Sequence, residues 1–395
     1  MGIIVTDVTN MKAIIIQRCA LNQSTRASKI VKTLIGTHGD YCVSFLGWNM
    51  GSKIELVNNS IIKESLTEIQ LRLNSPVGLN IIPFYLIIWW CFIFLTLMSK
   101  KWDITYAINL ESALPAVIAG RLKGKPVIYD YLDDRIGFIQ LSYIMKNMFI
   151  LLDKISMRLA SAVILADNMQ VEKIGEIPNS RVVAVYDSPD DIIKASSSDC
   201  KENKKFTLFY AGYLSSVRAL NLDKAFIAIK GLEGVQLVIA GYGDLVNEIK
   251  YLSQEYPEKI QFIGSISHEE VLRRTAKADL LLVLRSHHVL ENKYICGSKV
   301  LEAMMCGKPI LVNKDTSTAK KVQEEDCGLV VNANDIEEIQ SAIIKLRDNP
   351  ALCRKLGENA RKAYDERYSW RIMELRLLTL YRELTGRIGQ KKTEV

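Results

Sequence analysis

The chain lacks the residue patterns that several classes of protein require. Its eight cysteines are scattered without a CxxC pair, and it has only four histidines in 395 residues. This argues against a disulfide framework and a zinc site, and it favours reduced thiols. The chain has no arginine-rich arm and no aromatic RNA-binding signature, so its net charge of +7 does not indicate nucleic acid. Such a charge suits an anionic substrate or an anionic membrane surface.

The amino terminus shows no secretion signal. Asp7 interrupts the apolar stretch MGIIVTDVTNMKAIII, and no cleavage pattern follows it. The opening Met-Gly also lacks the Ser or Thr that myristoylation would require. We therefore expect a cytoplasmic protein.

One long segment, residues 73–99, carries no charge, and its part FYLIIWWCFIFLTLM, residues 84–98, is apolar on all sides. Its length would allow it to span a bilayer. A span would, however, separate strands that we expect to share one sheet. We therefore expect a helix partly buried against that sheet and partly in the interface of the inner membrane face, held by Trp89, Trp90 and the lysine pair that follows. A plain core helix is the second interpretation, and a true span is the third.

Short apolar runs alternate with helical patterns along the chain. MKAIIIQ, YCVSFLGW and ITYAINL are typical of buried strands, whereas TRASKIVKTLIGTHG and ESALPAVIAGRLKG have helical spacing. The alternation stops in a polar, Ser-containing stretch and then restarts. This predicts an α/β protein with two Rossmann-like, doubly wound domains that face a cleft. The expected parts are residues 1–190, a linker at 191–205, residues 206–365, and a last helix within 366–395 that would be able to cross back to the first domain.

The stretch GSKVLEAMMCGKPILV, residues 297–312, contains a short helix with a polar entry. Ser298 is a plausible N-cap and Gly307 a plausible stop. The amides at such a helix start, together with Lys299, would suit a diphosphate. One turn further, the carboxylate of Glu302 would be able to accept hydrogen bonds from two ribose hydroxyls. A helix-dipole Glu beside a solvated Lys is the alternative.

Two strand–turn–helix joints carry small residues where a ligand would be able to approach the backbone. They are Gly212, Ser215 and Arg218 in FYAGYLSSVRALNLDKAF, and Gly241 and Gly243 in VIAGYGDLVNEI. An Arg here would be able to fork onto phosphate oxygens, although an ordinary joint with a surface Arg fits equally. The second joint matches the dinucleotide fingerprint only weakly, and the first strand of the chain has no such glycines.

Several blocks in fixed order then suggest a family. FYAGYLSSVRAL, VQLVIAGYGD, IQFIGSIS, ADLLLVLRS, GSKVLEAMMCGKPILV, CGLVV and a late YSW resemble the nucleotide-sugar glycosyltransferases of family 4, which have the GT-B fold. The resemblance implies a retaining transferase that moves a hexose from a UDP- or GDP-sugar to an acceptor. It implies no metal and no cofactor, because Arg, Lys and the helix end would neutralise the leaving diphosphate. Ser298-Lys299 further resembles a subgroup of surface-polysaccharide assembly, which implies a lipid-linked or polysaccharide-precursor acceptor.

The resemblance also implies roles for residues. Glu302 would bind the ribose, Arg218 the phosphates, and Ser265-Ile266 the base through backbone contacts. Arg218, Lys299 and Glu302 would carry the chemistry. The expected donor-binding residues are Gly212, Ser215, Arg218, Gly241, Gly243, Ser265, Ile266, Tyr294, Gly297, Ser298, Lys299 and Glu302. The expected acceptor-side residues are Arg26, Asp130, Asp133 and Asp134, for which a structural role is the alternative.

Three positions depart from the family pattern. Tyr294 stands where many members have a Glu, Tyr213 where they have an Arg, and Leu132 near their amino-terminal His. These departures leave two alternative functions open. One is a nucleotide-sugar 2-epimerase of GT-B fold, and the other is a non-catalytic, glycosyltransferase-like partner subunit.

Overall fold

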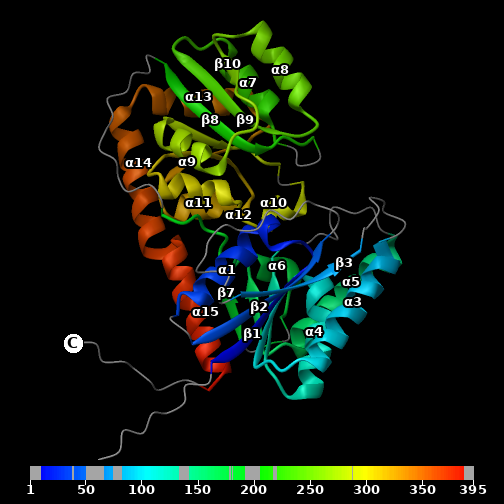
Figure 1. Ribbon diagram of the computed structural model, residues 1–395. Helices are drawn as coiled ribbons and strands as arrows, with labels where there is room; N and C mark the ends of the chain where they lie inside the picture. Colours follow the sequence, from blue (N-terminus) through cyan, green and yellow to red (C-terminus); the bar gives the residue numbers. More distant parts are fainter. Residues whose placement is uncertain are drawn as a thin grey trace, which may run out of the picture. The chain divides into compact units, whose positions relative to one another are not determined.

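The protein is described by a computed structural model (Figure 1). The described residues are 10–37, 40–49, 66–73, 82–132, 142–177, 179, 181–191, 205–216, 220–286 and 288–386. The chain forms two compact units. The first comprises Met1–Val185 together with Glu374–Val395, and the second is Tyr186–Met373.

Within its described residues, the first unit contains a sheet of seven parallel strands in the order β3-β2-β1-β4-β5-β6-β7. The strands are β1 (Met11–Gln17), β2 (Tyr41–Asn49), β3 (Leu66–Arg72), β4 (Ile104–Ile108), β5 (Val127–Tyr131), β6 (Ala162–Leu165) and β7 (Val182–Ala184). Strands β4, β5 and β6 are buried along their whole length. Their mainly apolar sequences follow from this, because helices on both faces of a parallel sheet leave no face for water.

The helices of the first unit are α1 (Thr25–Ile35), α3 (Ile82–Ser99), α4 (Leu110–Lys123), α5 (Tyr143–Leu159), α6 (Gln170–Ile174) and α15 (Trp370–Leu384), which joins this unit from Glu374 onward. Helix α4 packs between α3 and α5 (Figure 1). Two hydrogen bonds join the last helix to the rest of the unit. Thr33 Oγ1 donates to Glu374 Oε1 at 2.7 Å, and Arg376 Nη1 donates to the Ala184 carbonyl at 2.9 Å.

Residues 84–98 lie in α3, and one side of this helix belongs to the core. Its buried side chains are Leu86, Trp89, Ile93 and Leu97. Trp89 is 0% exposed and stacks on Trp48, with ring centroids 5.8 Å apart. The expectation that Trp89 holds α3 in a membrane interface is therefore wrong. Trp90 is half-buried, and its Nε1 donates to the Glu111 carbonyl at 3.1 Å. In the part of the chain that the structure describes, no helix has the length and apolarity needed to cross a membrane.

The described residues of the second unit contain six parallel strands in the order β10-β9-β8-β11-β12-β13. They are β8 (Phe206–Tyr213), β9 (Val235–Tyr242), β10 (Ile260–Phe262), β11 (Leu280–Val283), β12 (Ile310–Asn313) and β13 (Gly328–Val331). The helices are α7 (Leu222–Lys230), α8 (Val246–Glu255), α9 (His268–Lys277), α10 (Leu290–Tyr294), α11 (Ser298–Met305), α12 (Ser317–Glu324), α13 (Ile336–Arg347) and α14 (Pro350–Ala363), and a π-helical turn follows (Tyr364–Tyr368).

This architecture confirms the predicted pair of Rossmann-like, doubly wound domains. The sequence did not indicate β3, because LTEIQLR is a half-exposed edge strand with polar and charged residues. The structural division falls after Val185, whereas the prediction put it at residue 190. Tyr186 and Pro189 both belong to the second unit. The ring centroid of Tyr186 is 5.3 Å from that of Tyr368, and the Pro189 carbonyl accepts a hydrogen bond from the Tyr364 hydroxyl. Residues 192–204 of the expected linker lie outside the described residues.

Candidate functional site

The candidate site lies in the second unit, at the carboxyl ends of β8, β9 and β11. Strand β8 has β9 on one side and β11 on the other, so the strand order reverses at this point. In open α/β sheets ligands bind where the chain leaves adjacent strands in opposite directions. The segments that leave these three strands contain most of the expected donor-binding residues.

The backbone segments approach each other closely at the ends of β8 and β9. A Cβ atom on Gly241 would lie only 1.9 Å from the Gly212 carbonyl oxygen, and both glycines have positive φ angles, 147° and 152°. A Cβ on Gly243 would lie 2.1 Å from the Leu214 carbonyl oxygen. The Gly241 amide also donates to the Gly264 carbonyl at 2.8 Å. Gly241 and Gly243 therefore allow the loops to pack against one another, which is a different role from direct ligand contact.

Gly212 has a second neighbour, which comes from a distant part of the sequence. A Cβ atom on Gly212 would lie 2.4 Å from the Nζ of Lys299, the second residue of α11. The same Nζ lies 5.8 Å from the centroid of the Tyr210 ring. The Lys299 side chain thus extends from the start of α11 to the end of β8. The structure brings together two residues that the sequence assigned to one site on separate grounds.

The start of α11 differs in one respect from the expectation. The N-cap is Gly297, in an extended conformation, and Ser298 is the first helical residue and not the cap. Because glycine has no side chain, the cap forms no side-chain hydrogen bond to the helix amides. Gly307 has a φ of 62° just after the helix, as its expected stop requires, and β12 follows from Ile310.

Arg285 adds a second positive charge beside this helix start. It follows β11, and a Cβ atom on Gly297 would lie 3.1 Å from its Nη1. Its carbonyl accepts a hydrogen bond of 2.9 Å from Asn313 Nδ2, which anchors the loop to β12. The positive end of a helix dipole repels cations and attracts anions. A helix start that has Arg285 beside its N-cap and Lys299 as its second residue is therefore suited to an anion, and a diphosphate carries enough charge to balance both cations.

Glu302 lies one turn into α11 and is only 9% exposed. Its Oε1 is 3.2 Å from Nε2 of His268, the first residue of α9. Cys306 lies one turn further along. Burial and then the Glu302 carboxylate raise the pKa of the Cys306 thiol to about 12. The thiol therefore stays protonated.

The loop after β8 is held by an acid from the loop after β9. Ser216 donates from its amide to Asp244 Oδ2 at 3.0 Å and also from its hydroxyl. The side-chain and then the backbone hydrogen bond from Ser216 lower the pKa of the Asp244 carboxyl. Ser215, an expected donor-binding residue, is buried beside this pair. Arg218 lies outside the described residues, so its expected role stays a prediction.

The remaining expected residues lie on neighbouring segments. Ser265 is exposed and Ile266 half-buried in the turn between β10 and α9, after Gly264, whose φ is 73°. Tyr294 ends α10 and is half-buried, with Lys293 Nζ 5.2 Å from its ring centroid. These positions agree with a donor site, and the roles of the residues stay predictions.

The acceptor-side expectation for Arg26 and Asp130 needs a correction. Both side chains are almost fully buried in the first unit, at 1% and 0% exposure, and they form a bidentate ion pair, with Nε–Oδ2 at 2.9 Å and Nη2–Oδ1 at 3.1 Å. Arg26 also donates to the Val185 carbonyl, and Tyr106 donates to Asp130. Groups that are buried and satisfied in this way stabilise the fold and are not available to a substrate. Asp133 and Asp134 lie outside the described residues.

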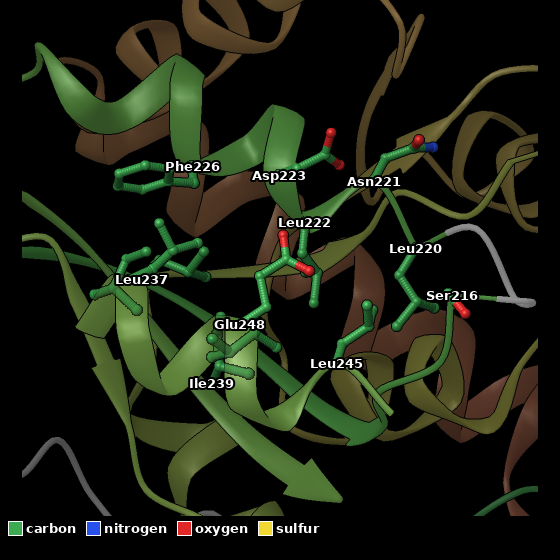
Figure 2. Close-up of a pocket in the computed structure, with 13 residues that line it drawn as sticks. Ser216, Leu220, Asn221, Leu222, Asp223, Phe226, Leu237, Ile239, Leu245 and Glu248 are labelled. Carbon is green, nitrogen blue, oxygen red and sulfur yellow. The ribbon is translucent and has the colours of Figure 1, made fainter. Parts of the chain in front are cut away.

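Two further features of the described residues bear on the site. No three His, Cys, Asp or Glu side chains lie close enough together there to hold a metal ion. A cavity of about 260 Å³ lies between α7 and α8 (Figure 2). Its lining is mainly apolar, and Asp223 and Glu248 are the acids at its surface. Because neither Lys299 nor Arg285 lines it, this cavity is not the anion site.

Sequence reasoning missed Arg285 and His268. Arg285 directly follows the buried run ADLLLVL, so a basic residue at the carboxyl end of a strand would have been the signal. His268 follows Ser267, whose side chain caps α9 by accepting from the Glu270 amide. That capping pattern predicts a helix start, and nothing in it predicts the approach of His268 to Glu302.

Comparison with known proteins finds a family that part of the chain resembles. Residues 191–363 match the family described as glycosyl transferases group 1. The matched residues lie within the second unit and make up less than half of the chain. An uncharacterized glycosyltransferase of Methanocaldococcus jannaschii is 29% identical over 43% of this chain and 43% of its own length. A GDP-mannose-dependent monoacylated alpha-(1-6)-phosphatidylinositol monomannoside mannosyltransferase of Corynebacterium glutamicum is 25% identical over 37% of this chain and 38% of its own. The chain thus spans less than half the length of these two relatives.

Solved structures confirm the GT-B fold. Sucrose-phosphate synthase from Thermosynechococcus elongatus aligns over 96% of this chain and 100% of its own, with a TM-score of 0.74 and 15% identity. Anabaena HepE in complex with UDP and glucose aligns over 95% of this chain and 100% of its own, with a TM-score of 0.68 and 15% identity. At such identities the likeness shows the fold alone.

Proposed function

We propose that this protein, whose residues 191–363 match glycosyl transferases group 1, is a retaining glycosyltransferase that moves a hexose from a nucleoside diphosphate sugar to an acceptor hydroxyl. The observation that carries the proposal is the position of two cations at the start of α11, where Arg285 lies against Gly297 and Lys299 is the second helical residue. Glu302 lies one turn further along the same helix, where we propose that it binds the ribose of the nucleotide. The HepE complexes with UDP and glucose support a nucleotide-sugar donor for this fold.

The proposed chemistry exchanges one bond to the anomeric carbon for another on the same face of the sugar. The bond from C1 to the diphosphate oxygen breaks, and the oxygen leaves with the electron pair. Lys299, Arg285 and the helix end stabilise the negative charge that develops on it. The acceptor oxygen then bonds to C1, and its proton passes to the leaving diphosphate. Glu302 holds the ribose and so fixes the donor in position.

We propose a lipid-linked or polysaccharide-precursor acceptor on the inner face of the cell membrane. The name of the Corynebacterium glutamicum relative, which specifies a phosphatidylinositol-based acceptor, supports a lipid acceptor. We also propose that transfer needs no divalent metal, because Lys299 and Arg285 supply the positive charge that a metal would bring to the diphosphate.

The test is donor binding by the purified full chain. Thermal unfolding is measured with UDP, GDP, their hexose conjugates, and the nucleosides uridine and guanosine. We expect one nucleoside diphosphate and its sugar to raise the melting temperature, because a ligand of the native state stabilises it, and the matching nucleoside to do so far less. The variant Lys299→Met/Arg285→Met should lose most of this shift, whereas Lys345→Met, an exposed lysine of α13, should keep it. Absence of any shift, or an equal shift in the double variant, would reject the anion site.

A further inference from the structure

The first unit exposes an apolar surface on the outer sides of α3, α4 and α5. We call it the apolar face. Its members, all exposed, are Ile87, Leu95 and Met98 of α3, Ile118 and Leu122 of α4, and Tyr143, Ile144, Met148, Ile150, Leu151 and Ile155 of α5. The three helices lie side by side in Figure 1, with α4 packed against both of the others. Scattered apolar residues are normal on a surface, but so many on three helices that pack side by side indicate an interaction site.

Helix α5 contributes most to the apolar face. Ile144 and Leu151 are 79% and 58% exposed, and Met148 and Ile155 continue the same stripe at helical spacing. The opposite side of α5 faces the core through Ser156 and Met157. Helix α5 therefore has two apolar sides. One packs on the core of the first unit, and the other is exposed.

Helix α3 repeats this arrangement. Its inner stripe packs on the sheet, as described for Trp89. Its outer stripe consists of Ile87, Cys91, Leu95 and Met98, all of them exposed. Helix α3 thus has one apolar stripe in the core and a second apolar stripe that is exposed. The exposed stripe contains no charged residue.

The charges around the apolar face are mainly positive. Residues 82–101, 110–125 and 142–159 contain eight lysines and arginines and two acids. One of these acids, Asp153, is buried and accepts a hydrogen bond from Tyr129, and the other, Glu111, is only half exposed at the start of α4. The exposed cations include Lys100 and Lys101 after α3, and Lys146 and Lys154 on α5. A second copy of the chain would bring these like charges together, which opposes self-association through this face.

We propose that the apolar face docks on the surface of an anionic lipid bilayer, with α5 as its main contact and α3 beside it. Aliphatic side chains enter the boundary between headgroups and acyl chains, and the flanking lysines bind anionic headgroups. This inference goes beyond the proposed transfer reaction and does not depend on the donor site. It also assigns the contact to residues other than Trp89, which is buried in the core.

The experiment measures flotation of the full chain with unilamellar vesicles of phosphatidylcholine, alone or mixed with phosphatidylglycerol. We expect binding to the mixed vesicles, at least tenfold weaker binding to the neutral ones, and weakening by NaCl, which screens the headgroup charge. Ile144→Glu/Leu151→Glu should weaken binding to mixed vesicles at least tenfold. Its matched control is Ile227→Glu/Leu375→Glu, at exposed apolar positions of α7 and α15, which should bind as the wild type does.

Two further measurements keep the test independent of one variant. Lys146→Glu/Lys154→Glu should weaken binding to the mixed vesicles, whereas Lys345→Glu/Lys362→Glu in the second unit should not. An environment-sensitive fluorophore on exposed Cys91 of α3 should shift to the blue with mixed vesicles, whereas one on exposed Cys42 should not. Circular dichroism and an unchanged thermal shift with donor nucleotide verify that each variant is folded.

Three results would overturn the proposal. The first is wild-type protein that stays unbound with the mixed vesicles. The second is unchanged binding by folded Ile144→Glu/Leu151→Glu. The third is self-association without lipid, seen by light scattering and abolished by that variant, because it would make the apolar face a contact between two copies. Failure of donor binding with intact flotation would reject the transferase proposal and leave this one standing.

Discussion

The side chain of Lys299 occupies the space that a side chain on Gly212 would need. A Cβ at residue 212 would lie 2.4 Å from Nζ and 2.5 Å from Cε of Lys299, and the φ of Gly212 is 152°. The absence of a side chain at the end of β8 therefore determines where a positive charge from α11 can lie. Gly212 therefore leaves the space in which the Lys299 ammonium lies.

We expect Gly212→Ala to weaken donor binding by about tenfold, because the methyl group displaces the Lys299 ammonium from the diphosphate site. The fold should also lose about 1–3 kcal/mol of stability, since alanine is strained at this φ. Isothermal titration with the donor nucleotide measures the first effect, and chemical denaturation measures the second. Gly231→Ala is the matched control, because its φ is −89° and the space around its Cβ is open. Unchanged nucleotide affinity in Gly212→Ala would contradict the proposal that Lys299 binds the diphosphate.

Glu302 should contribute to donor affinity through the ribose alone. We expect Glu302→Ala to weaken nucleotide binding by about 1.5–3 kcal/mol, the value of a hydrogen bond to a charged group, without unfolding the protein. A 2′-deoxy nucleotide should bind the wild type more weakly. The same nucleotide should show little further loss in Glu302→Ala, because both changes remove the same interaction. Fully additive losses would contradict the ribose role, and Glu337→Ala on exposed α13 serves as the control.

Transfer should not depend on a divalent metal. We expect the rate of nucleotide release with acceptor to stay within twofold when EDTA replaces MgCl2, because Lys299 and Arg285 neutralise the leaving diphosphate. The same assay with Lys299→Met should show a large loss that added Mg²⁺ does not restore. A wild-type rate that collapses in EDTA and returns with Mg²⁺ would contradict the proposal.

The sequence predicted the sheets well because burial leaves a strong local pattern. Runs such as MKAIIIQ and VQLVIAG lie on strands that helices cover on both sides, so most residues along them are apolar. The edge strand LTEIQLR is half in water and therefore lacks this pattern. The sequence of α3 does not indicate which of its sides is exposed, for a related reason. A helix that is apolar all round gives no sign of which side faces the core, and Trp89 was consequently placed on the wrong side.

The sequence predicted single residues of the candidate site, but it did not predict the contacts between them. Gly212, Lys299 and Glu302 each follow from a local rule about strand ends or helix starts. The approach of Lys299 to Gly212, or of His268 to Glu302, joins residues far apart in the chain, and no periodicity encodes it. Arg26 and Asp130 show the converse error. An Arg and an Asp near strand ends resemble a binding site in sequence, yet 104 residues apart they satisfy each other in the core.

Cysteine reactivity should follow burial in the folded protein. Burial raises the pKa of Cys306 and of Cys327 to about 12. Roughly one such thiol in 10⁴ is then ionised at pH 8, and the thiolate is the reactive form. We expect Cys42 and Cys91, which are exposed, to react with a chromogenic disulfide within minutes, and Cys306 and Cys327 to react only after denaturation. Mass spectrometry of labelled peptides identifies each site, and rapid labelling of Cys306 in native protein would contradict its packing next to Glu302.

The buried pair Arg26–Asp130 should matter for stability and not for catalysis. Removing one partner leaves an uncompensated charge in the core, so we expect Arg26→Met or Asp130→Asn to cost about 3–5 kcal/mol in the free energy of unfolding. The double variant Arg26→Met/Asp130→Asn should recover part of this loss, because neither charge is then left alone. Urea denaturation measures all three proteins, and the exposed pair Arg347–Asp348 is the control, with an expected change of about 1 kcal/mol or less. If a folded single variant instead kept its stability and lost acceptor affinity, the pair would belong to the binding site after all.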